Sequence, residues 1–219
     1  MPRCEAWTAG ERAILSRLRT PETLQRFIDD IAYNAGEGCR SPRWVMRDRR
    51  AHCMEGALFA AASLRFHGLG CRVLDMLAVR DDDHVIALYR RHGCWGAVAK
   101  SNFSGLRFRE PVYRTLRELV MSYFEPYFNE LGEKTLRSYS VPVDLARFDA
   151  MGWMTTDRDL EPIGDFLTAA RHIRILKPAM IRSLRKVDRR SYEAGMVGLD
   201  RRGLFRVKGA PGGTGKTRS

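Results

Sequence analysis

Residues 51–62 read AHCMEGALFAAA, a histidine and a cysteine followed by an almost entirely apolar, alanine-rich stretch. This stretch predicts a helix from about Cys53 to His67, and Gly68 follows where a left-handed C-cap residue is expected. A thiol at the start of a helix has two interpretations. Free cysteine packs like a small apolar residue. Alternatively, the unpaired amides and the positive end of the helix dipole lower the pKa of the thiol and make it a nucleophile.

The elements on either side of this helix define the fold class. Upstream, Thr20 and Pro21 have the residue types of an N-cap and a first turn, so another helix is expected there. Downstream the pattern changes to strands over 71–79, 84–89 and 95–99, the last two forming a hairpin. Further helices are expected beyond them, including one over 165–175. The order predicts an α+β fold with a mostly antiparallel sheet.

A cysteine nucleophile needs a base, and the base needs an orienting partner. His84 begins the first strand of the hairpin. If the chain turns near His92, the numbers of opposed residues sum to about 184 with an error of about two, so His84 faces the segment 100–102. Asn102 is therefore the predicted partner that accepts the imidazole N–H, and the alternatives are Ser101 and Asp83.

Four segments of the chain resemble the core of the bacterial transglutaminase-like superfamily: AHCMEGALFAAASLRFHG (51–68), VLDMLAV (73–79), DDHVIALY (82–89) and WGAVAKSN (95–102). The similarity covers roughly residues 20–145. It implies a papain-like core, in which a Cys-bearing helix packs on a small antiparallel sheet with extra helices. It also implies that Cys53 is the nucleophile and His84 the base. The superfamily usually has an Asp of a D-P pair where this chain has Asn102, which would orient the imidazole without adding negative charge.

The resemblance implies a cysteine-dependent hydrolase or acyl transferase that acts on an amide or peptide bond through Cys53, His84 and Asn102. Whether water or an amine resolves the thioester stays open, as do the substrate and the oligomeric state. Two other hypotheses remain. One is a non-catalytic binding module with the same fold, and the other is a nucleic-acid-associated protein that uses a basic C-terminal tail.

The net charge of +12 is concentrated near the C-terminus. Residues 171–219 contain 14 Lys or Arg against 3 Asp or Glu, whereas the first 170 residues contain 24 against 23. We therefore expect a transglutaminase-like domain with N-terminal helices over 1–165, a basic helical extension over 166–208 and a disordered tail over 209–219. Aromatic residues for base stacking are sparse in the extension, so a solvated basic helix is favoured over a nucleic-acid interface.

Composition argues against several other classes of protein. No apolar run is long enough to span a bilayer, and the charges scattered through the first 20 residues are untypical of a signal peptide. The five cysteines are an odd number with no C-x-x-C pair, which favours reduced thiols in a cytoplasmic protein.

No cofactor is expected. The potential metal ligands lack pairs at zinc-site spacing; they are Cys39, His52, Cys53, His84 and Cys94. APGGTGKT, residues 210–217, matches a relaxed phosphate-loop pattern. However, that motif works only between a strand and a helix, so it is interpreted as part of the flexible tail.

Overall fold

The structure, a computed structural model, describes residues 7–207. Its α-helices are α1 (Ala9–Arg17), α2 (Pro21–Asp29), α3 (Pro42–Asp48), α4 (Cys53–Phe66), α5 (Leu116–Met121), α6 (Glu161–Ala169), α7 (Pro178–Arg182) and α8 (Arg189–Gly195). Its strands are β1 (Ala32–Tyr33), β2 (Arg50–Ala51), β3 (Arg72–Ala78), β4 (His84–Arg91), β5 (Cys94–Val98), β6 (Arg109–Tyr113), β7 (Leu136–Ser140), β8 (Val143–Asp144) and β9 (His172–Arg174). Short 3-10 helices lie at Ser104–Leu106, Leu145–Met151 and Arg201–Gly203.

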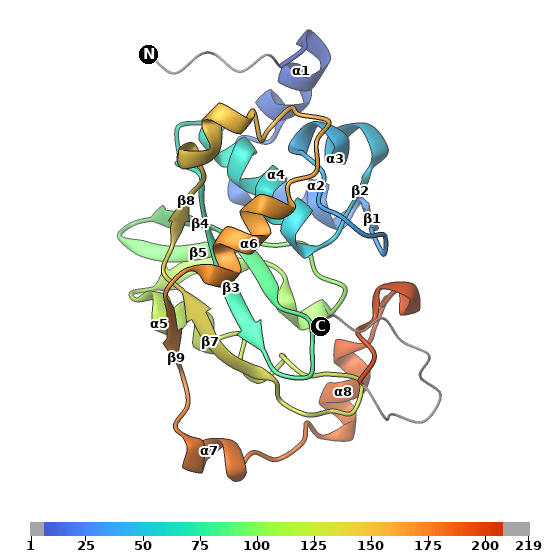
Figure 1. The fold of residues 1–219 in the computed structure, drawn as a ribbon, viewed down its shortest axis with the longest axis vertical. Helices are drawn as coiled ribbons and strands as arrows, with labels where there is room; N and C mark the ends of the chain where they lie inside the picture. The colour runs from blue at the N-terminus through green and yellow to red at the C-terminus, as the bar shows by residue number, and fades with distance from the viewer. Residues whose placement is uncertain (1–6, 208–219) are drawn as a thin grey trace.

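Most strands form one antiparallel sheet in the order β6-β5-β4-β3-β7-β9, and β8 pairs with β3. Strands β1 and β2 form a separate parallel pair. Helices α1 to α4 gather at one end of the molecule, and the sheet extends below them in Figure 1. The predicted mixture of helices with a mostly antiparallel sheet is confirmed.

The two faces of the sheet are covered by different apolar clusters. Along β4, Val85 belongs to the cluster that includes the buried residues of α4, such as Phe59. The next residue, Ile86, belongs to the second cluster, which includes Tyr123 and Tyr127. Alternation along the strand thus places successive side chains on opposite faces. Helix α4 covers the first face, and the chain around α5 covers the second.

The predicted hairpin and its register are confirmed. Residues His92 and Gly93 join β4 to β5 and have φ values of 52° and 79°, as a tight two-residue hairpin turn requires. Ala87 pairs with Val98. The numbers of these two paired residues sum to 185, which agrees with the predicted sum of about 184 within its error of about two.

The predicted boundary at residue 165 falls inside α6, so it does not separate two units. The expected helix over 165–175 ends at Ala169, and His172–Arg174 instead form β9, which pairs with β7 at the edge of the sheet. Pairing with β7 outweighs the local helical pattern because it satisfies the backbone groups at that edge. The basic stretch therefore contributes a strand to the sheet. The predicted disordered tail, 209–219, and the phosphate-loop pattern lie outside the described residues.

Among residues 7–207 no helix has the length and apolar character needed to cross a membrane.

Candidate active site

Cys53 is the first residue of α4, directly after the N-cap residue His52. Its thiol donates to the backbone carbonyl of Asp83, with an Sγ–O distance of 3.7 Å. The residue keeps part of its surface exposed, although protein surrounds the thiol closely. Gly56, almost one turn along α4, lets Lys100 pack directly on the helix, because a Cβ there would lie 2.3 Å from the Cβ of Lys100.

His84 is the first residue of β4 and is only 4% exposed. Its ring packs edge-on against Tyr123 and Tyr127, on the face of the sheet opposite α4. Nε2 lies 2.8 Å from the carbonyl oxygen of Leu106. Because a carbonyl oxygen can only accept, the neutral ring carries its proton on Nε2 and its lone pair on Nδ1.

Cys53 and His84 line the same pocket. The other residues that line it are Tyr33, Asp81, Asp82, Asp83, Ser101, Asn102, Phe103, Leu106, Tyr127, Gly203 and Phe205. The sulfur lies against the peptide groups on either side of His84, since its hydrogen bond is to Asp83 and the Val85 N–H is placed to stabilise a thiolate. The structure therefore brings the predicted nucleophile and base into one pocket, with each side chain hydrogen-bonded to a backbone carbonyl rather than to the other.

The structure corrects the prediction for Asn102. Its Nδ2 donates to the Asp200 carbonyl at 2.9 Å, and its Oδ1 accepts from the Asp200 N–H at 2.8 Å. The Leu106 carbonyl makes the bond to the imidazole that was expected from Asn102. The two alternatives also have other roles: Ser101 Oγ accepts from the Phe103 N–H, and Asp83 Oδ1 accepts from the Ala78 N–H.

Burial keeps both side chains neutral at rest. Burial raises the pKa of the Cys53 thiol to about 12, and the Asp82 carboxylate adds to the rise, although N–H groups of Val85 and Met54 oppose it. Burial lowers the pKa of His84 to about 4. The expectation of a lowered thiol pKa is thus wrong, because desolvation of the thiolate outweighs the helix N-terminus.

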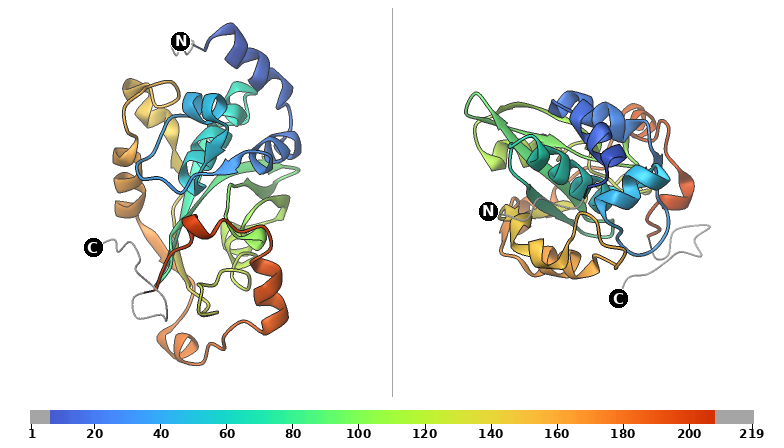
Figure 2. Two further views of the ribbon diagram at one scale, coloured as in Figure 1. Left: turned by 90° about the vertical axis from the view of Figure 1, so that its right-hand side faces the viewer. Right: turned by 90° about the horizontal axis from the view of Figure 1, so that it is seen from above.

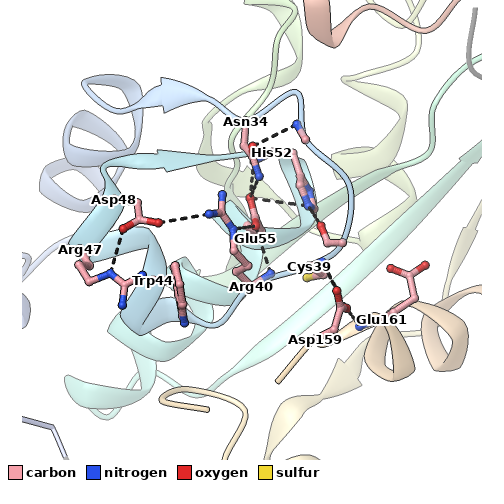
Figure 3. A network of polar contacts seen from close by, with 12 residues as sticks. Asn34, Cys39, Arg40, Trp44, Arg47, Asp48, His52, Glu55, Asp159 and Glu161 are labelled. Carbon is pink, nitrogen blue, oxygen red and sulfur yellow. Dashed lines mark hydrogen bonds and ion pairs between the residues drawn. The ribbon is translucent and has the colours of Figure 1, made fainter. Parts of the chain in front are cut away.

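A fully buried carboxylate, Glu55, organises the start of α4, and sequence reasoning missed it (Figure 3). One oxygen accepts from Asn34 Nδ2 at 2.9 Å and from the His52 N–H at 3.0 Å. The other accepts from the backbone N–H and the Nε of Arg40, both at 3.1 Å. The signal was present in the sequence, because Glu55 stands three residues after the N-cap as in a capping box.

The charge network around Glu55 continues to the surface (Figure 3). Arg40 also pairs with Asp48 at 3.2 Å, and Asp48 pairs with Arg47 at 2.9 Å. The ring of Trp44 lies between the two guanidinium groups, with Arg47 at 3.3 Å from its centroid and Arg40 at 5.7 Å. The network ties α3 and the chain before it to the N-terminus of α4, and so fixes the position of Cys53.

A second buried pair was also missed. Asp75 on β3 lies 3.4 Å from Nε2 of His172 on β9, and His172 Nδ1 is 2.7 Å from the Ala170 carbonyl. Burial raises the pKa of Asp75 to about 6, and the nearby Asp83 carboxylate contributes. Only the pairing of β9 into the sheet brings these residues together, so no local pattern predicts the pair.

Within residues 7–207, no group of three or more His, Cys, Asp and Glu side chains is arranged to hold a metal ion. Comparison with known protein-family models and with curated proteins found no match to this chain.

Proposed function

We propose that the pocket around Cys53 and His84 is the active site of a transglutaminase-like cysteine hydrolase or acyl transferase that acts on an amide or peptide bond. One observation carries the proposal. The sulfur of Cys53, at the N-terminus of a buried 14-residue helix, lies against the peptide groups that flank His84, in a pocket that both residues line.

The tautomer of His84 supports its role as the base. The Leu106 carbonyl holds the proton on Nε2, so Nδ1 is the nitrogen with a lone pair. A backbone carbonyl thus performs the orienting role that a carboxylate or amide side chain has in other cysteine enzymes. Because thiol and imidazole are both neutral at rest, proton transfer accompanies the attack of sulfur instead of preceding it.

In the proposed reaction, Cys53 Sγ forms a bond to the acyl carbon while its proton passes to His84 Nδ1. The C–N bond then breaks, and the imidazolium returns the proton to the departing amine. This step leaves a thioester on Cys53. Water or a second amine attacks the thioester and releases an acid or a new amide, and the thiol regains its proton. The N-terminal amides of α4 supply positive potential where the oxyanion forms.

The test measures peptide-bond hydrolysis and ammonia release from glutamine-containing peptides. Cys53→Ser should abolish turnover, and His84→Gln should lower kcat/KM by about 10²-fold or more, the usual contribution of a general base. Cys94→Ser is the matched control, because Cys94 is also a free, partly exposed thiol and lies outside the pocket. Turnover that persists in Cys53→Ser, or its absence under all conditions with wild-type protein, would refute the proposal.

A further inference from the structure

The segment from Asp200 to Val207, called the strap below, returns from α8 to the pocket. It begins with the 3-10 helix Arg201–Gly203, and Gly203 and Phe205 form part of the pocket lining. In the left view of Figure 2 this red segment runs between the blue N-terminal elements and the green part of the chain. One wall of the candidate active site is therefore a peptide segment distant in sequence from all the others.

Asn102 holds the start of the strap through its backbone. The amide donates to the carbonyl of Asp200 and accepts from the N–H of the same residue. A neighbouring β-strand would engage one residue of an extended peptide through the same two groups. This recognition depends on the backbone and not on the side chain of the residue bound.

The other end of the strap is held by Glu130. One carboxylate oxygen accepts from the Val207 N–H at 2.8 Å, and the other accepts from Arg206 at 2.9 Å. Val207 is buried, with 4% of its surface exposed. The strap is thus fastened at both ends by side chains of the domain that carries Cys53.

The middle of the strap packs against Tyr33 without space for a side chain. A Cβ at Gly203 would lie 2.3 Å from the Tyr33 ring and 3.3 Å from Asn102 Nδ2. Tyr33 and Cys53 line the same pocket. The glycine therefore lets the strap lie flat on the side of the pocket that contains the nucleophile.

We propose that the strap is an internal peptide ligand of this pocket, and that the site binds peptide substrates in its place, with one extended residue at Asn102 followed by a tight turn. Asn102 is the positioning residue that binds the peptide backbone, and Tyr33 selects glycine at the position that Gly203 occupies. In this arrangement the strap restricts access to Cys53 until a substrate peptide displaces it. The inference rests on the proposed function, because it names the substrate class of the same site.

The test uses the full-length chain and the rate at which iodoacetamide labels Cys53, followed by mass spectrometry. Gly203→Ala should displace the strap and raise the labelling rate about tenfold, equivalent to roughly 1.4 kcal/mol in the opening equilibrium. Hydrogen exchange across residues 199–207 should increase in parallel. Gly10→Ala is the matched control, because no atom lies within 4 Å of the added Cβ.

A second arm supplies the strap as a separate peptide. The nonapeptide LDRRGLFRV, which reproduces residues 199–207, should slow the labelling of Cys53 in Gly203→Ala. The same peptide with alanine in place of glycine should not. When Asn102→Ala is added to Gly203→Ala, the glycine peptide should slow the labelling of Cys53 less. The double variant should still unfold in a cooperative thermal transition.

The outcomes separate this inference from the proposed function. Equal labelling rates in wild type and Gly203→Ala, whether or not exchange of the strap increases, would overturn the internal-ligand proposal. If that happens while His84→Gln slows labelling and turnover, the proposed function survives. Faster labelling in Gly203→Ala that is blocked by the glycine peptide supports the strap. If His84→Gln then has no effect and no turnover occurs, the proposed function fails and the peptide-binding pocket remains.

Discussion

Replacing Glu55 by alanine should be among the most destabilising single changes in this domain. The carboxylate is fully buried and accepts four hydrogen bonds, one of them from the charged group of Arg40. Its removal leaves Asn34 and the backbone N–H of His52 without their acceptor. Breaking a buried ion pair from one side costs about 3–5 kcal/mol. For a domain of this size, that corresponds to a fall in Tm of roughly 6–20 °C.

The assay is urea and thermal unfolding followed by circular dichroism. Glu55→Gln is the informative second variant, because it keeps the volume and one acceptor oxygen but turns an NH₂ group toward two donors. We expect its loss of stability to lie below that of Glu55→Ala. The matched control is Glu193→Ala in α8, where the carboxylate is 60% exposed and pairs with a 91% exposed Arg189. That change should cost under about 0.5 kcal/mol.

A loss of less than about 1 kcal/mol in Glu55→Ala would contradict this reasoning. It would mean that water satisfies the donors around the empty site and that the Arg40 guanidinium finds another acceptor. In that case the start of α4, and with it Cys53, would not depend on the network drawn in Figure 3.

Three further predictions concern single side chains. Burial raises the pKa of Cys53 to about 12. The rate at which Cys53 is alkylated should therefore keep rising up to about pH 10, without a plateau near the ordinary thiol pKa of about 8.5. A measured plateau near pH 8 would contradict this. Burial also raises the pKa of Asp81 to about 7, so the folded state holds a proton that the unfolded chain loses above about pH 4. The free energy of unfolding of the wild type, measured with urea, should therefore fall from pH 4 to 7 relative to that of Asp81→Asn. If the two free energies change with pH in parallel, the raised pKa of Asp81 is refuted. Gln25→Leu removes both hydrogen bonds to the backbone of Ala99 and should cost about 2–4 kcal/mol in urea unfolding, whereas an unchanged midpoint would show that another group replaces the amide.

The elements that follow from neighbouring residues were predictable. The apolar run after Cys53 forms α4, and the hairpin formed with the expected turn, because strand pattern and turn residues act over a few positions. The register of β4 and β5 followed from the turn alone. These parts alone did not show that Cys53 and His84 meet, and only the family resemblance predicted that the two residues share a site.

The polar contacts within the site were not predictable in the same way. The partner of Asn102 is 98 residues further along the chain, and the partner of the His84 ring is a backbone carbonyl 22 residues away. A backbone carbonyl has no signature in the sequence. The direction of the thiol pKa was also missed, because a helix N-terminus is visible in the sequence whereas the depth of burial is set by the packed sheet.

The position of the strap near the end of the described chain determines when this wall of the pocket is synthesised. Residues 200–207 are translated after α4 and after every strand of the large sheet. The three side chains that hold the strap, Tyr33, Asn102 and Glu130, are all made before the segment that they contact. The last wall of the pocket is therefore supplied by the last described part of the chain to leave the ribosome.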